Sequence, residues 1–339
     1  MKILITGAAG FIGSFLVEEA LNQGFDTYAG VRASSSRQYL NDEKIKFVDL
    51  KYSDKTLLTE QLSELKNTVG KFDYIIHGMG VTKCKNKGDF DRINCGYTKN
   101  FVEALIESGS VPDKFVYISS LSAWGPGDSK TGRPIMLSDE PKPDTLYGAS
   151  KLKAEQYIAS LPDFPYIFLR PTGVYGPREK DYFVFNKTVA GGIVPAMGFQ
   201  TQYLTFIYVH DLVKLAFLAC KSNIVQKAYF VTDGKEYTDK EYAAIVKKHL
   251  GRKHTLNLRV PLFLVKFISY SLDTVCGWFG QTPTLNKDKY KILRVMNWKC
   301  ENKPTEDDFN FKAGYDLDKG TEEAIKWYMQ EKWIKNGKC

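Results

Sequence analysis

A glycine-rich turn near the start of the chain constrains the fold more than any other feature. Residues 2–6 form an apolar run, Gly7, Gly10 and Gly13 follow, and the apolar spacing of a helix continues to about residue 22. In a strand–turn–helix unit the first glycine permits a tight turn, the second lets the backbone approach a pyrophosphate, and the third lets helix pack on strand. Amides at the helix N-terminus would face that phosphate. The opening therefore predicts a phosphate-binding turn.

Strands and helices alternate from this turn to about residue 174. Further apolar strands are expected at residues 26–31, 46–50, 72–80, 114–118 and 166–170, with helices between them. Because β-α-β crossovers are right-handed, this order predicts an α/β fold with a Rossmann-type, doubly wound parallel sheet. The pattern loosens after residue 174 and becomes mainly helical from residue 238.

Composition bounds the remaining possibilities. A chain of 339 residues with 43% apolar residues can bury a core and form one large or two moderate domains. The net charge of +8 is spread along the chain and accompanies no nucleic-acid motif, so we expect small anionic ligands and no nucleic-acid partner. The six cysteines and four histidines show no metal-ligand spacing, so we expect reduced thiols, no metal site and a cytoplasmic location. Neither a signal peptide nor a membrane span is expected.

Tyr147 and Lys151 form the most informative catalytic pattern. Residues four apart lie on the same side of a helix, so the ammonium would lie beside the phenol and lower its pKa from about 10. Such a tyrosine can exchange a proton with an alcohol or a ketone. For these two residues alone, a chance pair on an exposed helix is the better interpretation. The glycine turn and a Ser119-Ser120 pair at the end of a strand favour an oxidoreductase.

The end of the second strand bears on the choice of cofactor. An acidic residue there would grip the ribose 2′-hydroxyl of NAD, but this chain has Val31 and Arg32, with three serines at 34–36. A guanidinium beside small hydroxyl residues suits a 2′-phosphate, so we expect NADP, with NAD as the alternative. Arg32 could instead stack on the adenine ring.

Several other positions follow the expected strands. Asp49 is either an acceptor for the adenine amino group or a cap of the next helix. Gly78 lies where the middle of the cofactor would pass, and His77 before it is interpreted as a packed core residue. Asn94, at the start of a helix, is either a cap or a site residue.

The most apolar segment covers residues 260–279. Lys266 and Asp273 are the two charged residues of this segment, and they interrupt the apolar run. We favour a core or lid helix for it, with a membrane-surface helix as the alternative.

In this order the motifs resemble those of the extended short-chain dehydrogenases/reductases, the NAD-dependent epimerase/dehydratase superfamily. The resemblance rests on the three glycines, Asp49-Leu50, Ser119-Ser120, the Tyr147/Lys151 pair and two later landmarks at residues 170–177 and 206–212. It implies a Rossmann domain interleaved with a smaller, mainly helical C-terminal substrate domain. We place the cofactor domain at residues 1–173 with about 205–233, and the substrate domain at residues 174–204 and 234–339.

The resemblance also implies roles for single residues. Tyr147 is the general acid/base, Ser120 is the catalytic serine, and Lys151 lowers the tyrosine pKa and holds the nicotinamide ribose. The implied cofactor contacts are Gly7, Gly10, Phe11, Ile12, Gly13, Arg32, Asp49, Leu50, Gly78, Asn94, Tyr147, Lys151, Pro171 and Thr172. The expected substrate contacts are Lys83, Ser120, Tyr147, Tyr182 and Phe183.

Departures from the family pattern narrow the reaction. Dehydratases of sugar nucleotides carry Asp-Glu after the catalytic hydroxyl residue, where this chain has Leu121-Ser122. Epimerases usually carry an asparagine where this chain has Gly173, and Trp124 replaces a tyrosine. Residues 170–177 are more similar to the ketone-reducing branch, the dihydroflavonol reductases and 3β-hydroxysteroid dehydrogenases.

We therefore expect an enzyme that transfers a hydride between NADP and a carbonyl or secondary alcohol of a small, ring-containing substrate. One alternative is a nucleotide-sugar epimerase with tightly bound NAD. Another, from a different functional class, is a dinucleotide-binding protein without turnover, because fold alone does not fix function. Members of the family are often homodimers.

Overall fold

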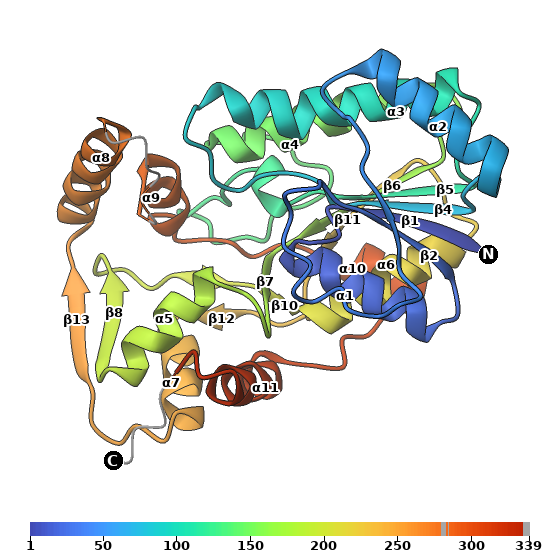
Figure 1. Ribbon diagram of the computed structural model, residues 1–339. Coiled ribbons are helices and arrows are strands. Elements are labelled where there is room, and N and C mark those ends of the chain that lie inside the picture. Colours follow the sequence, from blue (N-terminus) through green and yellow to red (C-terminus); the bar gives the residue numbers. More distant parts are fainter. Residues whose placement is uncertain (279–282, 284, 335–339) are drawn as a thin grey trace. The chain divides into compact units, whose positions relative to one another are not determined.

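Figure 1 shows the computed structural model of the protein, which describes residues 1–278, 283 and 285–334. The chain forms two compact units of three segments each. Unit 1 comprises Met1–Gly125, Pro141–Arg170 and Val213–Tyr229, and unit 2 comprises Pro126–Glu140, Pro171–Leu212 and Phe230–Cys339. The division of cofactor and substrate binding between two domains stays a prediction.

A seven-stranded sheet is the central element of the fold. Its order is β11-β6-β5-β4-β1-β2-β3, and neighbouring strands from β6 to β3 pair in parallel. The strands are β1 (Lys2–Thr6), β2 (Asp26–Gly30), β3 (Lys46–Val48), β4 (Tyr74–His77), β5 (Lys114–Ile118), β6 (Tyr166–Pro171) and β11 (Lys227–Val231). The predicted α/β class and doubly wound parallel sheet are confirmed.

Helices cover both faces of this sheet (Figure 1). On one face lie α1 (Phe11–Asn22) and α6 (Val209–Lys221), and on the other lie α2 (Lys55–Val69), α3 (Thr98–Glu107) and α4 (Leu146–Ala159). Strands covered on both faces are continuous apolar runs, which is why β1 and β5 could be placed from sequence.

Two shorter helices of other types belong to unit 1. The π-helix η1 (Phe90–Tyr97) leads directly into α3, and the 3₁₀ helix η2 (Leu121–Ala123) follows β5. The sequence analysis placed Asn94 at the start of a helix. Because the helical region begins at Phe90, Asn94 lies inside it, and the interpretation of Asn94 as a cap is wrong.

Unit 2 contains three short strand pairs and most of the later helices. The pairs are β7 (Gly173–Tyr175) with β10 (Phe206–Tyr208), β8 (Ile193–Met197) with β13 (Leu256–Val260), and β9 (Tyr203–Leu204) with β12 (Tyr237–Thr238). The helices are α5 (Asp181–Ala190), α7 (Asp239–His249), α8 (Leu262–Trp278), α9 (Lys287–Leu293), α10 (Lys303–Phe309) and α11 (Leu317–Gln330). An aromatic cluster forms the core of this unit, with Tyr175, Phe206, Tyr208, Tyr242 and Tyr328 buried.

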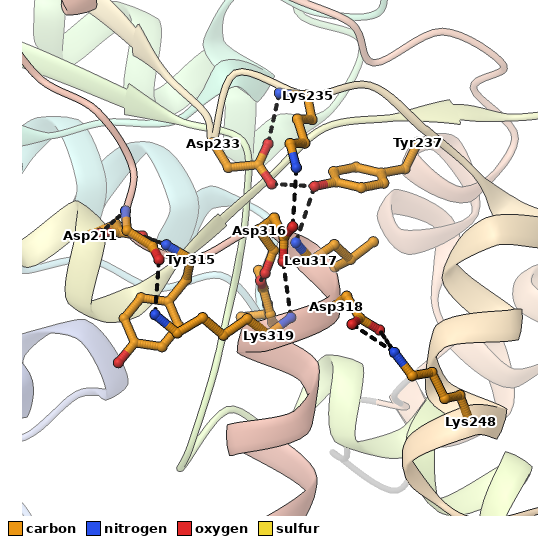
Figure 2. A network of polar contacts seen from close by, with 12 residues as sticks. Asp211, Asp233, Lys235, Tyr237, Lys248, Tyr315, Asp316, Leu317, Asp318 and Lys319 are labelled. Atoms are coloured by element: carbon orange, nitrogen blue, oxygen red, sulfur yellow. Dashed lines mark hydrogen bonds and ion pairs between the residues drawn. The ribbon is translucent and has the colours of Figure 1, made fainter.

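A polar network fixes the N-terminus of α11 within unit 2 (Figure 2). The buried Asp211 carboxylate accepts hydrogen bonds from the backbone amides of Gly314 and Tyr315, both at 2.9 Å. Asp316 caps α11 by accepting from the Lys319 amide at 3.0 Å. The landmark at residues 206–212 therefore includes an aspartate that anchors the chain before α11.

The cysteines in the described part of the chain are free thiols. Cys339 lies outside the described residues, as does residue 279, the expected end of the apolar helix. Among the described helices, none is both long enough and apolar enough to cross a membrane.

Candidate functional site

The turn between β1 and α1 has a geometry that requires glycine. Gly7 has φ of +70°, in the left-handed region, and a Cβ there would lie 2.7 Å from the carbonyl oxygen of Gly78. A Cβ on Gly13 would overlap the carbonyl oxygen of Gly7. Around Gly10, a Cβ would meet only the Gly7 oxygen, at 3.1 Å, among the described atoms. The turn is thus tight on the protein side and open at Gly10.

The N-terminus of α1 supplies hydrogen-bond donors at this turn. Gly10 is the N-cap, and no side chain caps the helix. The amides of the first helical turn, which include those of Phe11 and Ile12, have no acceptor within a helix and carry the positive end of its dipole. An anionic group such as the diphosphate of a dinucleotide therefore fits this turn in both charge and space.

The expected ribose and adenine contacts follow β2 and β3. Arg32 is exposed just after β2. Asp49 follows β3 and forms an ion pair with Lys51 at 2.6 Å. The cap of α2 is Asp54, which accepts from the Leu57 amide at 3.1 Å, so the capping interpretation of Asp49 is wrong.

Ser120 and Tyr147 come together at the end of β5. The Ser120 hydroxyl caps η2 by accepting from the Ser122 amide at 3.1 Å, and its interaction with the Tyr147 phenol lowers the pKa of that phenol. Tyr147 lies in the first turn of α4, whose N-cap Thr145 accepts from the Gly148 amide at 3.0 Å. A Cβ on Gly148 would overlap the Ser122 carbonyl oxygen. The lack of a side chain at this position therefore lets α4 approach η2.

The protonation of Tyr147 differs from the expectation. Burial raises the pKa of Tyr147 to about 12, and the interaction with Ser120 offsets part of that rise. The predicted lowering of this pKa by Lys151 is wrong for this structure, because the ammonium donates to the Ile118 carbonyl oxygen at 2.8 Å and lies 4.6 Å from the centre of the Tyr117 ring. The phenol is therefore protonated at neutral pH.

Lys151 also has a shifted pKa. Its side chain is buried, and this burial lowers the pKa of Lys151 to about 8, an effect that the negative charge of Glu155 opposes. Glu155 lies one turn further along α4 and forms a buried ion pair with Arg170 at 2.7 Å. The Arg170 guanidinium lies 3.7 Å from the centre of the Trp124 ring. Trp124 is the residue that stands where the family pattern has tyrosine. Sequence reasoning missed Glu155, although its spacing of four from Lys151 was a signal.

Asn94 connects the segment after β4 with α4. Its amide oxygen accepts from the Val81 amide at 2.7 Å, and its amide nitrogen donates to the Val81 carbonyl oxygen and to the Ser150 hydroxyl, both at 3.0 Å. Ser150 precedes Lys151 on α4. Asn94 thus ties the segment after β4 to α4, the helix that carries Tyr147 and Lys151.

A chain of buried hydrogen bonds continues from Asn94 to the end of β1. The Thr98 hydroxyl donates to the Asn94 carbonyl oxygen at 2.8 Å, and it accepts from Nε2 of His77 at 3.0 Å. Nδ1 of His77 then accepts from the Thr6 hydroxyl at 2.8 Å. Burial lowers the pKa of His77 to about 3, so its ring is neutral. The interpretation of His77 as a packed core residue is confirmed, but its linking position had no sequence signal.

The other expected contacts are distributed over both units. Lys83 is an exposed residue of unit 1. In unit 2, Pro171 is buried and the Thr172 amide donates to the Val231 carbonyl oxygen at 3.1 Å. Tyr182 and Phe183 lie on α5, and Phe183 packs within the aromatic core of that unit.

Comparison with known proteins agrees with the dinucleotide-type turn and the Ser120, Tyr147 and Lys151 positions described above. A match to the NAD dependent epimerase/dehydratase family covers residues 3–231. The chain belongs to this family. It is an enzyme of the extended short-chain dehydrogenase/reductase type, as its motifs predicted.

The names of similar proteins refer to different activities. The UDP-glucose 4-epimerase of Vibrio cholerae is 28% identical over 308 residues, which are 88% of this chain and 90% of that protein. A 3-beta-hydroxysteroid dehydrogenase of Mycolicibacterium neoaurum is 27% identical over 281 residues, 78% of this chain and 74% of that protein. The crystal structure of the Bordetella bronchiseptica enzyme WbmG in complex with NAD and UDP shares the fold, with a TM-score of 0.77, 21% identity, and coverage of 98% of this chain and 96% of that one.

Proposed function

We propose that this epimerase/dehydratase family member transfers a hydride between NADP and a carbonyl or secondary alcohol of a small substrate. The observation that carries the proposal is that the Ser120 hydroxyl interacts with the Tyr147 phenol, and that Tyr147 shares its helix with the buried Lys151. A serine and a tyrosine that interact in this way can both contact one substrate oxygen. That arrangement suits proton exchange at a carbonyl or an alcohol.

The side chains of this site would act in a defined order. Because the pKa of Tyr147 is about 12, its phenol holds a proton at neutral pH and can give it to the oxygen of a carbonyl that is being reduced. The Ser120 hydroxyl would orient that oxygen and stabilise its developing negative charge. The bound nicotinamide supplies or accepts the hydride. Lys151 would contribute a nearby positive charge while its ammonium stays bonded to the Ile118 carbonyl oxygen.

Two positions support a ketone reductase over the other reactions of the family. A Cβ on Gly173, where epimerases usually carry asparagine, would overlap the Tyr182 phenol oxygen and lie 3.2 Å from the Phe206 ring. Tyr182 therefore takes the space that a side chain aimed at a nucleotide diphosphate would need. Leu121 and Ser122 stand where sugar-nucleotide dehydratases carry two acids, so this pair offers no acid for the loss of water.

Replacing Tyr147 by phenylalanine tests the acid/base role. Tyr147→Phe should lower kcat by about 10²–10⁴-fold, because it removes the phenolic hydroxyl that would exchange the proton, while the affinity for NADP is unchanged. The matched control is Tyr157→Phe, the same deletion on the same helix, at a phenol that donates to Glu103 at 2.9 Å. This control should keep full activity. Substantial turnover by Tyr147→Phe would contradict the proposed chemistry.

The preference for NADP rests on Arg32, whose exposed guanidinium follows β2 without an acidic neighbour in residues 31–37. The intact enzyme should have a lower KM for NADPH than for NADH, and Arg32→Ala should raise the KM for NADPH alone. Loss of a charge-assisted contact of this kind costs about 1.5–3 kcal/mol, or roughly 10- to 150-fold. Arg294→Ala, also at an exposed arginine, is the control. Equal use of both cofactors by the intact enzyme would exclude the preference.

An epimerase with tightly bound NAD is the second candidate, supported by the similarity to the Vibrio cholerae enzyme. The two reactions differ in what happens to the cofactor, because an epimerase returns the hydride and a reductase releases oxidised cofactor. Purified protein that retains NAD through dialysis and converts a nucleotide sugar without net oxidation of cofactor would favour the epimerase. Exchangeable NADP and a stoichiometric loss of NADPH absorbance would favour the reductase.

A further inference from the structure

α8 exposes apolar side chains over most of its outward surface. Val265 and Ser269 are buried, whereas Phe263 and Phe267 are each 70% exposed. Among the side chains of α8 whose exposure the structure describes, the exposed large apolar ones, which we call the α8 face, are Phe263, Leu264, Phe267, Ile268, Tyr270, Leu272 and Val275. At about 100° per residue, these positions occupy roughly half of the helix circumference.

The charged residues of α8 lie outside this face. Lys266 and Asp273 fall at the border between the α8 face and the buried side, when the helix is viewed along its axis. A surface helix ordinarily carries its charges on the outward face and its apolar residues inward. The expectation of a core helix is therefore wrong, since large side chains of α8 are exposed. Contiguous apolar surfaces of this kind mark sites of interaction.

The strand that leads into α8 also exposes apolar side chains. Within the parallel pair of β8 and β13, Leu256 lies opposite Ile193. Leu256 and Leu258 share one face of β13 because side chains alternate along a strand, and they are 65% and 47% exposed. Figure 1 shows β13 beside β8 and continuing into α8, which packs beside α9.

The segment that contains α8 is also rich in positive charge. Residues 256–294, from β13 through α9, contain six Lys and Arg and two Asp, a net charge of +4. Two ammonium groups, those of Lys266 and Lys287, lie 5.8 and 5.0 Å from the centre of the Tyr270 ring. Cations thus border the apolar α8 face directly.

We infer that the α8 face docks on an anionic lipid surface. Phe263 and Phe267 insert at the boundary of headgroups and acyl chains, and the surrounding Lys and Arg side chains contact the headgroups. Such a surface covers the apolar side chains and also balances the local charge. A second copy of this chain seated on the same face would bring two positively charged segments together, each with a net charge of +4, which opposes self-association there.

Sedimentation of the full chain with lipid vesicles tests this inference. The protein should pellet with vesicles of phosphatidylcholine mixed with phosphatidylglycerol at least about 10-fold more than with phosphatidylcholine alone, because each lysine near an anionic surface adds to binding. Added NaCl should release it. Phe263→Ser with Phe267→Ser should lower the binding about 10-fold or more, since two large side chains no longer insert.

Matched variants separate docking from general effects. Ile106→Ser with Val225→Ser removes two exposed apolar side chains of unit 1, both 45% exposed, and should leave vesicle binding unchanged. Lys266→Gln on α8 with Lys291→Gln on the neighbouring α9 should weaken binding, whereas Lys44→Gln with Lys130→Gln, with the same loss of charge elsewhere, should not. Circular dichroism melts establish whether each variant is folded. If the double phenylalanine variant does not fold, the double lysine variant tests the docking instead.

Three outcomes would overturn the inference. The first is a chain that stays in the supernatant with the anionic vesicles. The second is equal vesicle binding by the intact chain and by the folded phenylalanine variant. The third is an oligomer that ignores vesicles and dissociates in the phenylalanine variant, which would make a second copy of the chain the occupant of the α8 face.

Discussion

The buried ammonium of Lys151 affects both the pKa of this residue and the stability of the folded protein. It bonds to the Ile118 carbonyl oxygen and faces the Tyr117 ring, and the Glu155 carboxylate lies one helical turn away. Burial disfavours the charged form, so the pKa of this lysine falls from 10.5 to about 8. A lysine held in this way lowers the stability of the folded protein at neutral pH, as functional groups in active sites often do.

Lys151→Met should therefore stabilise the protein relative to the intact chain more at pH 7 than at pH 10. Between about pH 8 and 10.5 the unfolded chain keeps a proton on this lysine that the folded chain releases, so the stability of the intact protein rises with pH. The penalty is fully present below pH 8, amounts to at most about 3 kcal/mol, and is lost above pH 10.5. Urea unfolding of both proteins at the two pH values measures it.

Lys153→Met is the control for this comparison. Lys153 lies on the same helix, and its bond with Asp91 at 2.5 Å raises its pKa rather than lowering it. The stability gap between this control and the intact protein should not follow the pattern of Lys151→Met. A gap for Lys151→Met that is the same at pH 7 and pH 10 would contradict the shifted pKa.

Residue spacing predicted the positions of Tyr147 and Lys151 but not their electrostatics. The spacing of four correctly placed both on α4, and the serine pair after β5 correctly placed Ser120. The pKa values depend instead on burial and on the Ile118 carbonyl oxygen, which comes from a strand 33 residues earlier. The His77 hydrogen-bond chain depends on partners 71 and 21 residues away, so no local pattern in the sequence could reveal it.

At the scale of elements, the contact between α4 and η2 decides whether the site is assembled. The N-terminal turn of α4 carries Tyr147, and η2 begins directly after Ser120. Gly148 faces the Ser122 carbonyl oxygen so closely that a Cβ would overlap it. Glycine is the poorest helix former apart from proline, so its presence in this first turn reflects the close approach of the two helices.

Gly148→Ala should lower both kcat and stability, although alanine favours helices. The new methyl group would push α4 away from η2 and separate the Tyr147 phenol from Ser120, and overpacking of this kind costs about 1–3 kcal/mol. Gly96→Ala is the matched control, because a Cβ there meets only the Asp91 carbonyl oxygen, at 3.7 Å. Steady-state kinetics and urea unfolding of both variants measure the difference. A fully active Gly148→Ala enzyme would show that the two helices need no such contact.

The elements themselves were predictable where burial alone sets the pattern. Strands of the parallel sheet are apolar on both faces, so β1 and β5 were predicted at their observed bounds. The π-helix η1 was not, because its first turn precedes the apolar spacing that marks α3. The pair of β8 and β13 was missed as well, since its partners are about sixty residues apart and Leu256 and Leu258 face outward. For α8 the periodicity was sufficient to predict a helix but not which face is covered.

At the scale of the whole molecule, the chain leaves unit 1 and returns to complete it. The returning segment Val213–Tyr229 contains most of α6 and the start of β11, the edge strand beside β6. Phe217 of α6 is buried and packs on Phe25, with ring centres 5.7 Å apart. Lys221 donates to the Gln23 side chain at 2.6 Å. The beginning of the chain therefore depends on residues nearly two hundred positions later.

A chain that ends after residue 173 should accordingly fail to form a stable unit. Without α6 and β11 the edge of β6 is unpaired and Phe25 loses its cover, and burial of a single phenylalanine is already worth about 3–5 kcal/mol. We expect no cooperative thermal transition for this fragment and no rise of its Tm with NADP. A chain that ends after residue 233 keeps both elements and should show both, at a lower Tm than the full protein. Circular dichroism melts with and without NADP make the comparison, and cooperative melting of the shorter fragment would refute this dependence on the returning segment.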